Sequence, residues 1–260
     1  MNGDADRRAR VNVLGLGIDP LTMPLAVATI GRWIASRERR YICVAAVHSV
    51  MACRHDPSLR GVFKRSGLTT PDGMPLVWLC RLAGHRAERV YGPDLVLAVC
   101  AASVARGWRH YFFGGGPGVA QVLAERMQDR FAGLQVAGTF TPPFGDSSIE
   151  VDEANVRRVN ETLPDIVWVG LGTGRQEHWM ADHRDRLEAP LLIGVGAAFD
   201  FLSGRKPQAP RWLQRSGLEW LFRLASEPGR LWPRYREYPL FLILLAAQRA
   251  GLREFRVDEA

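Results

Sequence analysis

One carboxylate stands where a rigid loop would hold it. Asp72 lies between Pro71 and Gly73 in the segment TTPDGMPLVW, and the apolar residues that follow begin a helix. A carboxylate held in this way could act as the general base for a hydroxyl group. An aspartate in an ordinary turn has the same local sequence, and the segment alone favours that alternative.

A first glycine-rich segment, HYFFGGGPGVAQVLAERM, has the pattern of a strand, a loop and a helix. Gly114, Gly115 and Gly116 would let the backbone approach a diphosphate at the helix N-terminus. A tight turn without a ligand has the same pattern. A dinucleotide site also needs an acidic residue at the end of the next strand, about 20 residues further on. The segment LQVAGTF has none, so NAD is not expected and no cofactor is predicted.

A second glycine-rich segment, IVWVGLGTGRQEHWM, places Gly172 before a helix that opens with Gln176 and Glu177. These two side chains could hydrogen-bond a nucleotide base or a ribose. Alternatively, Glu177 only complements the helix dipole in the first turn. His178 and His183 lack the H-E-x-x-H spacing of a zinc site and are expected to be structural.

The negative charge of a diphosphate bound at the glycine loop must be neutralised by a metal ion or by the protein. A divalent ion that bridges phosphates is often held by an Asp-x-Asp pair, and the sequence has such a pair only at Asp4 and Asp6. We therefore expect no metal, and assign the task to arginines and helix N-termini. The candidates are Arg89, Arg223, Arg230 and Arg234, each of which could also be a solvated surface charge.

The order of elements predicts an α/β fold with a Rossmann-like, mostly parallel sheet flanked by helices. From Val11 to about Ala197, short apolar runs alternate with segments of helical period. The predicted strands are VNVLGLGI, YICVAAV, HYFFGG, LQVAG, DIVWVGLG and PLLIGVG. The predicted helices are Met23–Arg37, Asp94–Ala105, Val119–Phe131, Val151–Thr162 and Glu177–Leu187. We predict a disordered tail at 1–10 and a core domain at 11–204.

Residues 205–260 differ in composition and are predicted to form an appendage of short helices. Tryptophans and tyrosines are interleaved with arginines, and Pro228, Pro233 and Pro239 interrupt any long helix. Residues 204–260 contain 11 Lys or Arg and 6 Asp or Glu, so 11 − 6 = +5 of the formal net charge of +7 lies here. Aromatic and basic residues together favour a membrane surface, with Trp232, Tyr238 and Phe241 as contacts; a subunit interface is the alternative.

Other features narrow the class of protein. Cys43, Cys53, Cys80 and Cys100 have no C-x-x-C spacing, which favours buried reduced thiols. The charged N-terminus lacks a secretory signal, and the apolar run Leu240–Ala247 is shorter than the roughly 20 residues of a membrane span. A cytoplasmic location is expected. Without a recognition motif for the basic residues, no nucleic-acid partner is expected.

Five segments in order resemble the signature blocks of the WecG/TagA/CpsF glycosyltransferases (glycosyltransferase family 26). They are TPDGMPLVWLCRLAGHRAERVYGPDL, YFFGGGPGVA, PDIVWVGLGTGRQEHWM, GVGAAFDFLSG and GLEWLFRLASEPGRLWPRY. Their order and spacing cover roughly Val11 to Tyr238. The resemblance therefore rests on most of the chain and not on one glycine loop.

The resemblance implies an inverting, metal-independent enzyme of wall-polymer or exopolysaccharide synthesis. It would move an N-acetylmannosamine-type sugar or a hexose from a UDP-sugar to a polyprenyl-diphosphate-linked saccharide, at the inner face of the plasma membrane. Asp72 would be the catalytic base, and Arg89 and His48 would lie at the acceptor. The residues implied at the donor are Gly114, Gly115, Gly116, Gly172, Gln176, Glu177, Asp200, Arg223, Arg230 and Arg234.

Two segments depart from the family pattern, at two residues each. Val44 and Ala46 stand where the family commonly has Thr and Asn, so two side chains that could hydrogen-bond a sugar are absent. Gly174 and Arg175 replace a usual Pro-Lys pair, which keeps the charge and adds flexibility. A non-catalytic protein that binds a nucleotide sugar or a lipid diphosphate is therefore the alternative function, and a homo-oligomer is left open.

Overall fold

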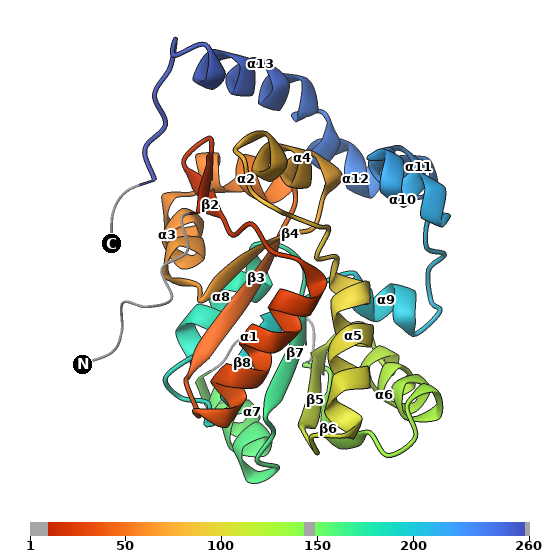
Figure 1. Ribbon diagram of the computed structural model, residues 1–260. Helices are drawn as coiled ribbons and strands as arrows, with labels where there is room; N and C mark the ends of the chain where they lie inside the picture. The colour runs from red at the N-terminus through yellow and green to blue at the C-terminus, as the bar shows by residue number, and fades with distance from the viewer. Residues whose placement is uncertain (1–9, 143–148, 258–260) are drawn as a thin grey trace, which may run out of the picture. The chain divides into compact units, whose positions relative to one another are not determined.

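The computed structural model describes residues 10–142 and 149–257 (Figure 1). The chain divides into two compact units. Unit 1 is assembled from residues 1–22, 45–89 and 209–260, and unit 2 from residues 23–44 and 90–208. The predicted tail at 1–10 lies, except for Arg10, outside the described residues, as do Asp4 and Asp6.

The α/β class with a mostly parallel, Rossmann-like sheet is confirmed. The sheet has the strand order β4-β3-β8-β7-β5-β6. The bounds are β3 Arg40–Ala45, β4 Leu68–Pro71, β5 Arg109–Gly114, β6 Gln135–Phe140, β7 Ile166–Gly170 and β8 Leu191–Gly194. Neighbours from β3 to β6 pair in parallel, with Tyr111 opposite Val167 and Val167 opposite Leu192. The carboxyl ends of β5, β7 and β8 therefore meet at one edge.

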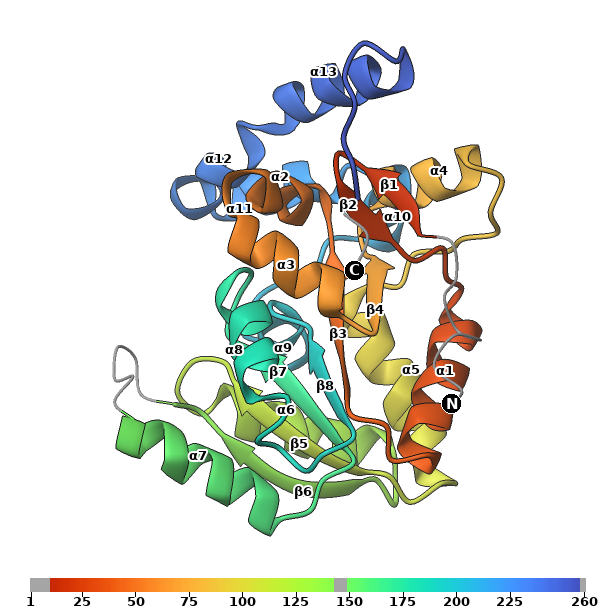
Figure 2. The same ribbon diagram turned by 90° about the vertical axis from the view of Figure 1, so that its left-hand side faces the viewer.

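Helices cover both faces of the sheet in unit 2. They are α1 Met23–Ala35, α5 Gly92–Val104, α6 Val119–Arg130, α7 Ile149–Glu161, α8 Arg175–His183 and α9 Ala198–Leu202. Figure 2 shows α7 and α8 on the opposite side of the sheet from α1 and α5. Strands covered on both faces need apolar side chains at every position. The residues from Ile166 to Val169 in β7 are accordingly all buried.

Unit 1 opens with a hairpin where the sequence predicts one strand. The segment VNVLGLGI forms β1 (Val11–Val13) and β2 (Leu16–Ile18), which pair antiparallel. Leu14 and Gly15 have φ of 51° and 89°, and the Asn12 side chain accepts a hydrogen bond from the Gly15 amide at 2.9 Å. The single-strand prediction is wrong because the alternation of apolar residues continues through a two-residue turn.

In the described part of unit 1, the other elements are helices and the strand β4, which the sequence analysis missed. The helices are α2 Val47–His55, α3 Pro57–Arg65, α4 Met74–Leu82, α10 Arg211–Ser216, α11 Glu219–Ser226, α12 Pro228–Tyr235 and α13 Tyr238–Arg249. Pro228 and Pro239 lie in the first turns of α12 and α13, where a missing N–H costs nothing, and Pro233 lies inside α12.

Two expectations about the remaining chain can be compared with the structure. All four cysteines are free and buried, as predicted, and burial raises the pKa of the Cys80 thiol to about 11 and that of Cys100 to about 12. Among residues 10–142 and 149–257, no helix has the length and apolar character needed to cross a bilayer.

Candidate active site

Asp72 is fixed by its backbone at the junction of β4 and α4 in unit 1. Its amide donates to the Ala45 carbonyl at 2.8 Å, and its own carbonyl accepts from Arg89 Nε at 2.5 Å. Gly73 is the N-cap residue of α4, and Pro75 follows in the first turn. The backbone of Asp72 is therefore held on both sides, at a loop between a strand and a helix of which the sequence predicted only the helix.

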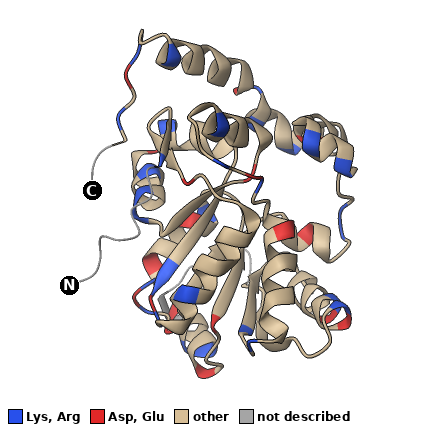
Figure 3. Cartoon of the chain, viewed as in Figure 1, with Lys and Arg blue, Asp and Glu red and all other residues tan. Residues whose placement is uncertain are grey.

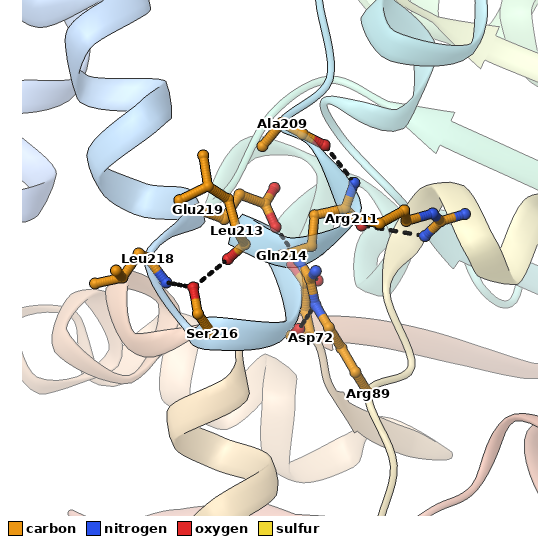
Figure 4. Close-up of polar contacts among 9 residues, drawn as sticks. All are labelled: Asp72, Arg89, Ala209, Arg211, Leu213, Gln214, Ser216, Leu218 and Glu219. Carbon is orange, nitrogen blue, oxygen red and sulfur yellow. Dashed lines mark hydrogen bonds and ion pairs between the residues drawn. The ribbon is translucent and has the colours of Figure 1, made fainter.

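The Asp72 carboxylate shares the Arg89 guanidinium with Glu219 (Figure 4). Arg89 Nη2 lies 2.5 Å from Glu219 Oε2 and 3.5 Å from Asp72 Oδ1. Glu219 is the first residue of α11, so the C-terminal segment of unit 1 contributes directly to this cluster. Sequence reasoning named Asp72 and Arg89 but missed Glu219, because a Glu in the first turn of a helix usually only complements the dipole.

The environment of Asp72 makes its carboxyl group a stronger base. Burial raises its pKa to about 6, and the Glu219 carboxylate contributes in the same direction. The positive charges of Arg89 and Arg223, and the hydrogen bond from Arg89, oppose the rise without cancelling it. A carboxyl group that titrates near neutral pH is suited to general base catalysis.

His48 belongs to the same unit and is neutral at neutral pH. Burial, followed by the charges of Arg234 and Arg223, lowers the pKa of its imidazole to about 3. A neutral imidazole can both donate and accept a hydrogen bond, which suits contact with a hydroxyl group. His48 lies in the first turn of α2, which begins one residue after Ala46.

Two tyrosines and a tryptophan from the C-terminal helices pack together near these groups. The rings of Trp220, Tyr235 and Tyr238 are 5.1 to 5.8 Å apart, centroid to centroid. Burial raises the pKa of both tyrosines, and Asp72 and Glu219 add to the rise. The phenols therefore stay protonated at neutral pH and form an uncharged neighbour to the Asp72 cluster.

The three predicted arginines of the C-terminal segment have different surroundings. Arg223 and Arg234 both act on the charge of His48, and Arg223 also acts on that of Asp72. Arg230 forms an ion pair with Glu227 on the surface, with Nε 2.6 Å from the carboxylate. The structure thus groups Arg223 and Arg234 with the predicted acceptor residues, and gives Arg230 a different partner.

The predicted glycine residues lie at the carboxyl edge of the sheet in unit 2. Gly114 ends β5 with φ of 116°, and a Cβ at this position would lie 2.7 Å from the Gly170 carbonyl oxygen. Gly115 has φ of 75° and donates its amide to the same carbonyl at 2.9 Å. These glycines are therefore needed where two strand ends approach each other closely, whether or not a ligand binds there.

Gln176 and Glu177 are both buried at the N-terminal turn of α8 in unit 2. Glu177 accepts hydrogen bonds from the Gly174 amide at 2.6 Å and from Gln176 Nε2 at 2.9 Å. Within the described part of the chain no group donates to Gln176 Oε1, which lies beside Gly196 at the end of β8. Burial raises the pKa of Glu177. A buried acceptor without a partner at a strand-end edge indicates a place for a ligand's N–H or O–H.

Three further side chains stand near this edge of unit 2. Asp200, in the first turn of α9, forms an ion pair with Lys206 at 3.1 Å. Arg205 lies beside the glycine loop, since a Cβ on Gly116 would be 2.8 Å from its Nη1. Thr141 donates to the Gly114 carbonyl at 2.9 Å. The sequence analysis missed Arg205, although it precedes Lys206 directly and two adjacent cations at a loop are a signal for an anion.

The candidate residues therefore form two sets, one within each unit. Asp72, Arg89, Glu219 and His48 make up a titratable cluster in unit 1, and the glycines with Gln176 and Glu177 make up a polar edge in unit 2. In the ranges that the structure describes, no three His, Cys, Asp or Glu side chains gather in a way that could hold a metal ion.

Comparison with known proteins places this chemistry in a known group. The sequence model described as "Glycosyl transferase WecG/TagA/CpsF family" matches residues 11–254. A relative from Bacillus spizizenii (strain ATCC 23059 / NRRL B-14472 / W23) is 27% identical over 200 residues, which are 76% of each chain. One from Staphylococcus aureus (strain MW2) is 23% identical over 250 residues, 95% of this chain and 96% of its own.

Both relatives are named N-acetylglucosaminyldiphosphoundecaprenol N-acetyl-beta-D-mannosaminyltransferase. The parallel sheet, its glycine-rich edge and these matches define the chain as a glycosyltransferase. It belongs to the WecG/TagA/CpsF family, as the five sequence blocks predicted.

Proposed function

We propose that the protein transfers an N-acetylmannosamine-type sugar from a UDP-sugar to a polyprenyl-diphosphate-linked saccharide, with inversion and without a metal ion. The observation that carries the proposal is the largely buried Asp72 carboxyl group, whose side chain is 19% exposed and whose pKa is raised to about 6 beside Arg89. The names of the relatives support the acceptor, which in those proteins is a diphosphoundecaprenol-linked N-acetylglucosamine.

In this mechanism Asp72 takes the proton of the acceptor hydroxyl while that oxygen attacks the anomeric carbon. The new glycosidic bond forms on one face of the sugar as the bond to UDP breaks on the other, so the configuration inverts. Arg223 and Arg234 offset negative charge on the diphosphates, and the neutral His48 orients the hydroxyl group. The glycine edge, Arg205, Gln176 and Glu177 bind the nucleotide.

The test is nucleotide release from a panel of UDP- and GDP-sugars, with and without a polyprenyl-diphosphate-linked N-acetylglucosamine acceptor. We expect acceptor-dependent release from one donor, and a loss of at least about 100-fold in Asp72→Asn, since general base catalysis contributes about 10²- to 10⁴-fold. Near-normal turnover by Asp72→Asn would remove Asp72 from the role of base. Release that requires added Mg²⁺ would contradict the metal-independent step.

The alternative is a binding protein without turnover, and Ala46 is the observation that favours it. Ala46 is the N-cap residue of α2, and its methyl group lies 3.7 Å from the position of a Cβ on Gly73, next to Asp72. An apolar residue there removes a polar contact close to the carboxylate. Measurable UDP binding with no release from any donor, together with activity gained in Ala46→Asn, would support this alternative.

We also propose that the C-terminal helices bring the enzyme to the inner face of the plasma membrane. Trp232, Leu242 and Ile243 are exposed, and arginines recur along α10 to α12 (Figure 3). Phe241 is buried and does not offer the surface that the sequence analysis assigned to it, while Tyr238 is half-buried, with its ring tilted against Trp220 and edge-on to Tyr235. Exposed apolar and basic side chains together match an anionic bilayer surface.

Cosedimentation with vesicles tests this docking. Wild-type protein should bind vesicles that contain anionic lipid more strongly than neutral ones, and added salt should weaken the binding. Leu242→Ser with Ile243→Ser should lower the bound fraction severalfold, because two apolar side chains no longer enter the interface. Exposed Leu163→Ser in unit 2 is the control. Equal binding of all variants to both vesicle types would contradict the docking proposal.

A further inference from the structure

The burial of Glu219 is not explained by a favourable interaction with the dipole of helix α11. Glu219 is the first residue of α11, yet its side chain is only 10% exposed, and its carboxylate contacts Arg89, 130 residues earlier in the chain. A carboxylate that is taken out of water at this cost is normally paired, and Arg89 is its partner. The pairing joins the C-terminal segment of unit 1 to the loop that carries Asp72.

The Arg89 guanidinium lies closer to the Glu219 carboxylate than to the Asp72 carboxylate. Nε is occupied by the Asp72 main-chain carbonyl at 2.5 Å, so the guanidinium cannot turn freely. Nη2 then lies 2.5 Å from Glu219 and 3.5 Å from the Asp72 carboxylate. A contact of 3.5 Å is at the limit of a hydrogen bond, so Glu219 has the strong interaction and Asp72 the weak one.

Several neighbours of Asp72 in unit 1 keep one charge state near neutral pH. Arg89 and Arg223 are arginines, which stay protonated in proteins, and Arg234 acts with Arg223 on His48. His48, with its pKa lowered to about 3, stays neutral, as do Tyr235 and Tyr238, whose pKa values are raised. Asp72 is therefore the group whose charge changes, and the position of the Arg89 guanidinium determines how easily it does so.

We propose that Glu219 is a positioning residue, which holds the Arg89 guanidinium away from the Asp72 carboxylate and so keeps Asp72 basic enough to accept a proton. The inference rests on the proposed role of Asp72 as base. The packing of α11 then matters for catalysis. If α11 is displaced, Glu219 moves away with it and Arg89 pairs with Asp72 alone.

The test is the pH dependence of kcat/KM in Glu219→Gln, which keeps the shape and removes the charge. Arg89 should then favour Asp72, so the acid limb of the profile should move to lower pH by about half a unit to one unit. Above the limb the rate should fall about 3- to 10-fold, because the base is weaker. The matched control is Glu237→Gln, a carboxylate of the same segment paired with His55, and its limb should coincide with that of the wild type.

Arg89→Gln provides an independent measurement. Removing the guanidinium leaves Asp72 beside Glu219 without a cation between them, so the acid limb should move above that of the wild type. This result does not depend on the folding of Glu219→Gln. In the double variant Arg89→Gln, Glu219→Gln the limb should lie below that of Arg89→Gln, because the direct repulsion is relieved.

The outcomes separate this inference from the proposed function. A lower rate in Glu219→Gln with an unmoved limb would show a merely structural role and overturn the inference. A limb that stays in place or moves down in Arg89→Gln would do the same. Full activity of Asp72→Asn would instead overturn the proposed role of Asp72 as base. If Asp72→Asn is inactive and the acid limbs of the other variants do not move, the role of Asp72 stands and the positioning role of Glu219 is rejected.

Discussion

At the scale of single residues, the Asp72 carboxyl group combines its proposed catalytic role with a cost in stability. Burial makes its charged form unfavourable, and the raised pKa of about 6 expresses that cost. Because the folded pKa lies above the unfolded value, the folded state binds more protons between about pH 4 and 6. The free energy of unfolding is therefore reduced as pH rises through this window.

Asp72→Asn should consequently stabilise the fold at pH 7 while it removes activity. The gain should be on the order of 1 to 2 kcal/mol, because the amide carries no charge to bury. At pH 4, where the wild-type carboxyl group is protonated in the folded state, the two proteins should unfold at nearly the same denaturant concentration. Urea titrations at both pH values check this; an Asn variant less stable at pH 7 would contradict it.

Gln176 and Glu177 give a second prediction at this scale, about the orientation of an amide. The Glu177 carboxylate accepts only, so it fixes Nε2 of Gln176 toward itself and leaves Oε1 as the free acceptor. Glu177→Gln removes this restraint and should weaken UDP binding about 10-fold, measured by calorimetry. The exposed Glu188→Gln is the control. Unchanged affinity in Glu177→Gln would exclude the orienting role.

At the scale of elements, the two glycines that flank the loop between β5 and α6 should differ in tolerance. A Cβ on Gly114 would collide with the Gly170 carbonyl at 2.7 Å, whereas one on Gly118, with φ of 74°, would meet no atom within 4 Å. Gly118→Ala should cost about 1 kcal/mol through backbone strain alone. Gly114→Ala should cost at least about 3 kcal/mol, because strands β5 and β7 must also separate. Thermal unfolding of both variants compares them.

A second prediction about stability concerns Arg184, which lies in the turn between α8 and β8. Its buried guanidinium donates to the carbonyls of Arg40, Leu187, Ala189 and Pro190, and burial lowers its pKa to about 10. Arg184→Met should destabilise the fold by about 3 kcal/mol, because buried carbonyls lose their donor. Arg186→Met, which breaks a surface pair with Asp152, should cost less than about 1 kcal/mol. Equal losses would contradict this assignment.

The elements that the sequence predicted are those with a clear period and length. Helices such as Val119–Arg130 and buried strands such as Ile166–Gly170 carry continuous local signals. β4, with the sequence LTTP, is too short and too polar to show alternation, and only its place in the sheet makes it a strand. The turn at Leu14 and Gly15 was missed because its residues are apolar and small, unlike those of common hairpin turns.

The site was predictable only where a residue is informative by itself. The carboxylate between Pro71 and Gly73 could be named as a candidate from its type and neighbours, whereas Arg89 was placed beside it only by the resemblance to the family. Glu219 could not be named, because its role depends on a contact across 130 positions. Pairing between charged groups that lie far apart in the chain leaves no local pattern in the sequence.

At the scale of the whole molecule, unit 1 is built from three separated stretches of chain, while unit 2 needs nothing beyond residue 208. A ribosome makes the N-terminal stretches first, and domains fold as their residues emerge. A nascent chain that ends at Gln208 has every residue of unit 2, and has Asp72 and Arg89 without Glu219. Biosynthesis itself therefore sets an order of events: unit 2 can fold once residue 208 has emerged, and the cluster of Asp72, Arg89 and Glu219 forms only after residue 219 has been translated.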